Sequence, residues 1–157
     1  MPTIDQIRAA IAATIVSAVP AAAVHDYERF AAEQAKFREF YLSGAAPDQR
    51  ILGYHVRRAS TREVAESTGR WSIWHRWRIR GAMAVDDADA SEKLFDAQIE
   101  TIRTAFRADE SLGGLIFGMV EASTGEVGIQ VLDEGPVMFA GVLCHFAEMR
   151  LTTQHLL

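Results

Sequence analysis

The chain has 157 residues and a formal net charge of −5 at pH 7. This length is typical of one domain, and it suffices to bury a hydrophobic core without a disulfide or a structural metal. Apolar residues make up 49% and charged residues 24%, as in ordinary globular proteins. The acidic balance argues against a basic nucleic-acid-binding protein. We therefore expect a single domain over residues 1–157.

The first predicted element is a helix that begins near Thr3 and ends before Pro20. Thr3 and Gln6 have the spacing of a capping box, and the residue before a proline disfavours helix. One helical face carries four isoleucines, Ile4, Ile7, Ile11 and Ile15, which indicates packing on a sheet. The uncharged residues 9–24 also have some features of a signal peptide, but they lack leucine and continue this stripe, so we favour the helix.

Residues 25–43, HDYERFAAEQAKFREFYLS, are harder to assign. The aromatic residues Tyr27, Phe30, Phe37 and Tyr41 fit one helical face, although the first few residues fit an extended chain as well. His25 stands beside two acids, but neighbours in sequence point apart on most backbones. We interpret HDYE as a helix N-terminus with Asp26 near the cap rather than as an acid–base pair. The composition of residues 43–48 predicts a loop.

The next two predicted elements are strands over residues 50–58 and 71–85, joined by a polar hairpin loop at 59–69. The second strand alternates strictly. Its apolar face contains Trp71, Ile73, Trp77, Ile79, Met83 and Val85, and its other face contains Ser72, Arg76, Arg78 and Arg80 with Trp74 among them. A period of two with one apolar face predicts a half-buried antiparallel strand that turns Trp71 and Trp77 toward the core.

A helix is predicted over residues 86–109, with a capping pattern at Asp89 and Glu92. Its buried stripe is Phe95, Ile99, Ile102 and Phe106. Strands are then predicted at 115–120, 126–132 and 137–151, separated by STG and by DEGP at 133–136. The sequence therefore predicts an α+β fold, a mixed, mainly antiparallel β-sheet flanked by helices on one face.

Signatures of chemistry are absent from the sequence. It has no phosphate-binding loop, no dinucleotide fingerprint, no nucleophile elbow and no zinc-binding helix motif. The single cysteine, Cys144, lies in an apolar run and is expected to be a buried free thiol; the adjacent His145 would point to the opposite face of a strand. The acidic run 86–89 is better explained by capping than by a bound cation. We predict no catalytic, cofactor-binding or metal-binding residues and expect that the protein is not an enzyme.

Half of the 16 Lys and Arg residues fall between Arg50 and Arg80, against two acids, Glu63 and Glu66. If the two strands form a hairpin, the basic patch contains Arg57 or Arg58 with Arg76, Arg78 and Arg80, and Trp74 can stack on an arginine there. The patch is interpreted as a protein interface, because arginine and tryptophan anchor interfaces. A solvated outer face and a phosphate-binding surface are the alternatives. The rest of the chain is acidic, which suits subunits packed head to tail.

Four stretches carry a family resemblance: RAAIAATIVSAVPAAAVHDYERF, ILGYHVRRAS, WRIRGAMAVDDADASEKLFDAQIETIRTAFRADESLGG and a long closing strand. In order and length they resemble the tail terminator, or tail completion, proteins of tailed bacteriophages. The resemblance implies a small mixed sheet flanked by helices and a hexameric ring. Such a ring caps the head-proximal end of the tail tube, stops tube polymerisation and joins the tail to the head–neck connector.

From the resemblance we expect a homo-hexamer that contacts the tail tube protein and the connector, with DNA passing through the lumen without sequence-specific binding. No membrane is expected to be involved, and the expected location is the virion, with assembly in the host cytoplasm. The candidate contact residues are the patch, His25, Asp26 and Tyr27, and the polar loop 59–69. Three alternatives remain: another head–tail connector or neck protein, a small cytosolic α+β enzyme or ligand-binding domain, and a nucleic-acid-binding module.

Overall fold

The computed structural model describes residues 1–157. Its sheet has the strand order β1–β3–β4–β6–β5, with β2 paired to β3 outside this path. The elements are α1 (Ile4–Ala18), β1 (Ala23–His25), α2 (Gln34–Glu39), β2 (Leu42–Ser43), β3 (Arg50–Ser67), β4 (Arg70–Ala84), η1 (Asp87–Asp89), α3 (Ser91–Ala108), β5 (Gln130–Phe139) and β6 (Val142–Leu156). Only the β1–β3 pair is parallel. The predicted α+β class with a mainly antiparallel sheet is confirmed.

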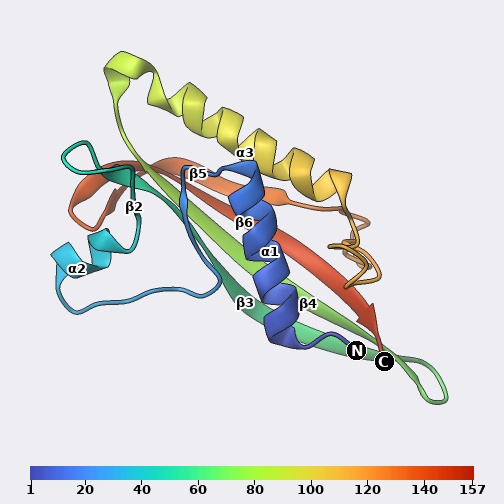
Figure 1. The fold of residues 1–157 in the computed structure, drawn as a ribbon. Coiled ribbons are helices and arrows are strands. Elements are labelled where there is room, and N and C mark those ends of the chain that lie inside the picture. The colour runs from blue at the N-terminus through green and yellow to red at the C-terminus, as the bar shows by residue number, and fades with distance from the viewer.

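The two long helices, α1 and α3, lie side by side across one face of the sheet (Figure 1). Each presents the stripe that the sequence predicts. The buried residues of these stripes are Ile7, Ile11 and Ile15 in α1 and Phe95, Ile99, Ile102 and Phe106 in α3. From the sheet they meet Tyr54, Val56, Trp77, Ile79 and Met149, and these residues form one continuous core. The Trp77 ring nitrogen donates a 2.9 Å hydrogen bond to Thr153 Oγ1, so the largest core side chain has no unsatisfied donor.

The short helix α2 packs on the opposite face, together with β2. Because strand side chains alternate, Ile51, Ala82 and Cys144 point away from α1 and α3. With Tyr41 they form a second buried cluster, against which Phe37 of α2 packs. The prediction of helices on one face therefore describes the two long helices, and α2 covers one end of the other face.

Two glycines make room for tyrosines on the two faces. A Cβ at Gly81 would lie 2.3 Å from Cε1 of Tyr54, whose ring crosses that residue on the helix-covered face. A Cβ at Gly53 would lie 2.8 Å from Cδ1 of Tyr41 on the other face. Real Cβ atoms do not approach neighbours so closely, so these positions accept only glycine without rearrangement.

The polar segment 59–69 was predicted as a loop, and this prediction is wrong. β3 continues to Ser67, and only Thr68 and Gly69 form the turn before β4. The pairing of β3 with β4 continues through a register shift between Arg58 and Ser60 as far as Ser67. We call residues 60–71 the arm. β6 pairs with β4 from Ser72 onward, so only the end of the arm, residues 65–71, projects past the two chain termini (Figure 1). Its side chains are exposed except for the half-buried Val64, so they carry no alternation from which a strand could be predicted.

Three boundaries also differ from the prediction. The DEGP segment lies inside β5, which replaces the strand expected at 126–132; the turn into β6 is at Ala140 and Gly141. The strand expected at 115–120 consists of turns with isolated bridges at Gly118 and Val120. α3 begins at Ser91 after a left-handed Ala90, so Asp89 and Glu92 form no capping box.

Within residues 25–43, only α2 is helical, and His25 ends strand β1. Asp26 therefore caps no helix. None of the helices is long and apolar enough to cross a membrane.

Candidate functional site

The predicted arginines occupy the sheet face opposite α1 and α3, and we call this the arginine face. Arg57 of β3 lies opposite Arg78 of β4, which in turn lies opposite Arg150 of β6. Arg76 and Arg80 lie on the same face of β4, one alternation to either side. Arg58 is different, because it lies opposite the core residue Trp77 and so shares the helix-covered side of the sheet. The structure thus groups four of the five predicted arginines.

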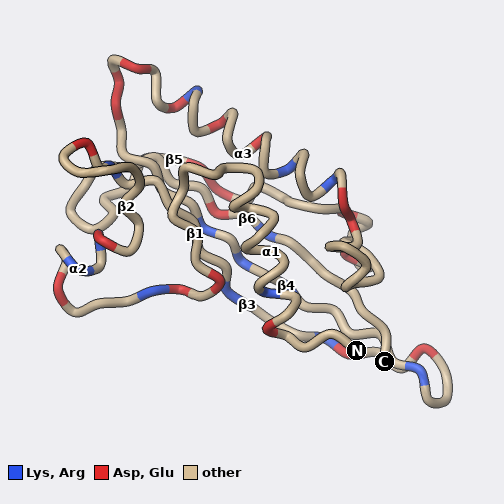
Figure 2. The backbone as a smooth tube through the Cα atoms, in the orientation of Figure 1, with Lys and Arg blue, Asp and Glu red and all other residues tan.

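A row of like charges is destabilising unless it is compensated. Here glutamates compensate it. Arg57 Nη1 lies 3.1 Å from Glu28, and Arg76 Nε lies 2.8 Å from Glu121. Glu148 takes both Arg78 Nε at 3.2 Å and Arg80 Nε at 2.9 Å, and Arg150 pairs with Glu126. The basic patch predicted from sequence is therefore a mixed-charge face. Figure 2 shows the Lys and Arg positions along β3 and β4.

Glu121 is the most deeply placed of these acids, with 6% of the residue exposed. Besides Arg76, its carboxylate accepts hydrogen bonds from Thr152 at 3.1 Å and from Ser123 at 2.9 Å. The hydrogen bond from Arg76, with those from the two hydroxyls, lowers the pKa of Glu121 to about 2. A carboxylate held in this way organises the loop before β5 rather than taking part in proton transfer.

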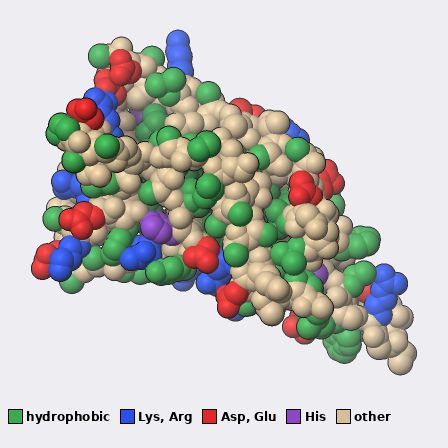
Figure 3. All heavy atoms as spheres, viewed as in Figure 1, with side chains coloured by type: hydrophobic (Ala, Val, Ile, Leu, Met, Phe, Trp, Pro, Cys, Tyr) green, Lys and Arg blue, Asp and Glu red, His purple; other side chains and the backbone are tan.

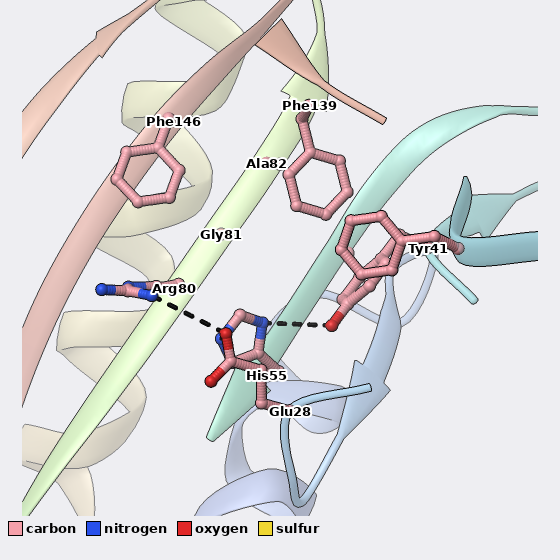
Figure 4. A pocket seen from close by; sticks show the side chains of 10 residues that line it. Glu28, Tyr41, His55, Arg80, Gly81, Ala82, Phe139 and Phe146 are labelled. Carbon is pink, nitrogen blue, oxygen red and sulfur yellow. Dashed lines mark hydrogen bonds and ion pairs between the residues drawn. The ribbon is translucent and has the colours of Figure 1, made fainter. Parts of the chain in front are cut away.

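A small cavity of about 160 Å³ opens on the arginine face beside α2. Figure 4 shows Phe146 on one side and Phe139 with Tyr41 on the other, above Gly81 and Ala82. Glu28, His55 and Arg80 close one end. The volume is below the range of about 300–1,000 Å³ that is usual for sites of drug-sized ligands.

Side chains at the closed end form a chain of polar contacts (Figure 4). The Tyr41 hydroxyl lies 3.2 Å from Nδ1 of His55, whose Nε2 lies 3.7 Å from Glu28. Arg80 Nη1 is 3.7 Å from the same carboxylate. Burial lowers the pKa of His55 to about 4, so the ring is neutral at pH 7. Tyr41 is buried, and the same burial raises the pKa of its hydroxyl.

This arrangement fixes the segment after β1 to the sheet. Glu28 lies in the irregular residues 26–33 and reaches Arg57, Arg80 and His55 at once. His25 adds a short hydrogen bond to the Phe40 carbonyl, and Arg29 stacks on Phe40 at 3.9 Å. Asp26 and Tyr27 make none of these contacts, and Tyr27 is half exposed. Of the predicted HDY residues, His25 is therefore structural and Tyr27 is the surface residue.

The three tryptophans have three different environments. Trp77 is buried in the core as predicted, but Trp71, expected on the same buried face, is 46% exposed on the arm. Trp71 lies beyond the two helices, so nothing covers it. Trp74 lies on the arginine side, where Arg62 stacks on its ring at 5.6 Å.

Cys144 is buried, as the sequence indicates, and burial raises its pKa to about 11, so the thiol is not reactive at neutral pH. No group of three His, Cys, Asp or Glu side chains is arranged to hold a metal ion. The residues that sequence reasoning missed are the acids Glu28, Glu121, Glu126 and Glu148. They are distant from the arginines in sequence, and only a predicted register could have paired Arg80 with Glu148.

Comparison of the sequence with profiles of known protein families, and with curated proteins, gives no match.

Proposed function

We propose that the chain is a structural assembly protein of the tail-terminator type. In this proposal six copies form a ring on the head-proximal end of a phage tail tube, end its polymerisation and join it to the head–neck connector. DNA passes through the lumen without sequence-specific contacts, and the protein belongs to the virion after assembly in the host cytoplasm. The order of sequence motifs supports the proposal, and the α+β fold agrees with it.

The observation that carries the proposal is the arm. The end of the arm, residues 65–71, is a two-stranded extension beyond the three-stranded part of the sheet, and no helix of the same chain covers it. Where it leaves the sheet it carries the exposed Trp71. A domain that acts alone gains nothing from ordering such an extension, because isolated two-stranded hairpins are only marginally stable. A ring requires each subunit to carry two different, complementary surfaces, and a projecting arm provides one of them.

The paired charges of the arginine face favour assembly over nucleic-acid binding. Arginines that already contact glutamates release few counterions when they meet phosphates, so they contribute little to DNA affinity. The small cavity also does not favour an enzyme, because a histidine with a pKa of about 4 is a weak general base at pH 7 and the tyrosine beside it is buried.

The first test is the native mass of the purified protein over a wide range of concentrations, by native mass spectrometry and sedimentation velocity. We expect a hexamer, or a monomer that becomes a hexamer as concentration rises or when tail tubes are added. In a phage that encodes this chain, deleting its gene should give tails of abnormal length that do not join heads. Tails of normal length that fail only at head joining would assign the protein to the connector. Tails and heads unaffected by the deletion would refute the proposal.

A further inference from the structure

A groove of about 390 Å³ lies between the first turns of α3 and the β5–β6 hairpin. Phe95, Leu143 and Phe146 provide an apolar lining, and Glu92, Asp96 and Glu134 are the acids that line it. Leu143 is 49% exposed, and the neighbouring Met138, opposite it in the ladder, is 64% exposed. The groove is therefore an apolar surface bordered by negative charge.

The acids of the groove have no basic partner in the chain. None of the ion pairs contains Glu92, Asp96 or Glu134, in contrast to the acids of the arginine face. Burial, and then the charges of Asp96 and Glu100, raise the pKa of Glu134. Figure 2 shows acidic positions recurring along the first half of α3. An arriving cation would relieve this repulsion.

Strand addition at this edge is disfavoured, although β5 is the last strand of the sheet. The edge contains Pro136, which has no N–H to donate, two charges at Asp133 and Glu134, and a register shift at residue 132. These are features by which proteins prevent further strands from pairing. A partner here would therefore contact side chains in the groove rather than the backbone of β5.

The complementary chemistry is at the other end of the same molecule. The arm has Arg70 next to the half-exposed Trp71 at its tip, and neither Arg70 nor Arg62 is in an ion pair. Figure 3 shows the arm as a narrow extension of the body, with basic and hydrophobic side chains on it. Glu63 and Glu66 are also on the arm, so its net charge is close to zero. The features that match the groove are local: an indole on one face of the hairpin, and the guanidinium groups of Arg70 and Arg62 on the other.

We propose that the groove between α3 and β5 receives the arm tip of a second copy of this chain. Trp71 of one copy packs on the exposed Leu143 of the next, and Arg70 and Arg62, on the opposite face of the hairpin, face Asp96 and Glu134 across the groove. The two surfaces are different and lie at opposite ends of the subunit (Figure 1), so each copy offers an arm and accepts one. This inference rests on the proposed ring and names the contact that closes it.

The test uses charge reversal in two variants, an arm variant Arg62→Glu/Arg70→Glu and a groove variant Asp96→Lys/Glu134→Lys. All four side chains are exposed, so both variants should fold, which circular dichroism and urea unfolding check. We expect each variant alone to associate at least about tenfold more weakly than the wild type in sedimentation velocity. A mixture of the two should regain association, because the reversed arm fits the reversed groove and the two native surfaces still fit each other.

Matched controls separate this contact from a general charge effect. Glu39→Lys/Glu110→Lys changes the net charge as the groove variant does, at two exposed acids elsewhere, and should associate like the wild type. Trp71→Ala should weaken association, whereas Phe117→Ala, which truncates an aromatic residue that is 69% exposed, should not. These two variants test the apolar part of the contact without a change of charge.

The outcomes distinguish this inference from the proposed function. Wild-type rings that survive both reversals would overturn the arm–groove contact and leave the ring proposal intact. Variants that fail alone and also fail as a mixture would overturn it as well, because complementarity would be absent. A wild-type chain that stays monomeric at millimolar concentration and also forms no ring on added tail tubes would overturn the contact, and tail length in the gene deletion would then decide separately whether the protein terminates tails.

Discussion

At the scale of single residues, Gly81 is fixed by the ring that crosses it. Because a Cβ at this position would lie 2.3 Å from Tyr54, we expect Gly81→Ala to lower the free energy of unfolding by about 1–3 kcal/mol. The measurement is the urea midpoint at constant slope. The loss should be smaller in a Tyr54→Leu background, since the two residues are in contact.

Gly135 provides the control, because it is also a strand glycine, but a Cβ added there would have no neighbouring atom within 4 Å and its φ is not positive. Gly135→Ala should leave stability unchanged or raise it slightly by restricting the unfolded chain. If both substitutions had the same effect, steric contact with Tyr54 would not be the reason for glycine at position 81.

Two histidines predict how stability depends on pH. Burial lowers the pKa of His55 and of His75 to about 4, and for His75 the neighbouring charge of His155 adds to the effect. Between pH 6.5 and pH 4 the unfolded chain therefore binds protons that the folded chain does not. Stability must fall as the pH drops through this window, by on the order of 1 kcal/mol or more for each histidine.

Urea unfolding at intervals from pH 8 to pH 4 measures this effect. The midpoint should be nearly constant above pH 7 and should decline below 6.5, before the carboxylates titrate. The pKa of Glu121 is lowered to about 2, so its contribution is lost only at still lower pH, between about 4.5 and 2. A His75→Asn variant should have a shallower decline between pH 6.5 and 4, and a slope identical to that of the wild type would contradict the assignment.

At the scale of elements, the N-terminal cap of α1 is the clearest local prediction. Gln6 N donates to Thr3 Oγ1 at 3.2 Å, and Thr3 N donates to Gln6 Oε1 at 2.8 Å. Thr3→Ala removes one half of this box and should reduce stability by about 1 kcal/mol. Thr101→Ala in α3 is the control: the Thr101 hydroxyl only donates back to Ala97 within the helix, so we expect almost no loss, or a small gain from helix propensity.

The elements that could be predicted from sequence are those with one buried face. The stripes of α1 and α3 and the alternation of β4 reflect which side meets the core, and the structure confirms them except at Trp71, which lies beyond the helices. The arm could not be predicted because both of its faces are in solvent, so its polar residues have no period. The segment DEGP has the composition of a turn, yet it forms an edge strand, where a proline is tolerated because one side of the backbone has no partner.

The candidate site, too, could be predicted only in part from the sequence. Period-two alternation was enough to place Arg76, Arg78 and Arg80 on one face. It could not show that Arg58 lies on the other side, because β3 is polar on both sides after Val56. Nor could it predict which glutamates pair with these arginines, because the glutamates lie in segments outside the hairpin. Sequence patterns record burial, whereas charge pairing between distant segments depends on topology.

At the scale of the whole molecule, the ion pairs between arginines and glutamates decide which surfaces carry the net negative charge. The arginine face combines Arg57, Arg76, Arg78, Arg80 and Arg150 with Glu28, Glu121, Glu126 and Glu148, so it has little excess charge. Three acids without a basic partner, Glu92, Asp96 and Glu134, lie instead around the groove beside α3. A phosphate backbone would meet a nearly neutral face on one side and a negative surface on the other. Both would weaken binding to DNA.

We therefore expect duplex DNA to bind no more tightly than a dissociation constant of about 10⁻⁴ M at physiological salt. Fluorescence anisotropy with a labelled duplex, over a series of salt concentrations, measures this. Glu28→Gln/Glu148→Gln keeps the shape of both side chains but frees Arg57, Arg78 and Arg80, so affinity should rise by about tenfold and the salt dependence should steepen. Micromolar binding by the wild type, lost steeply as salt rises, would instead support a nucleic-acid-binding function. The arginine face would then act on phosphates rather than hold the fold together.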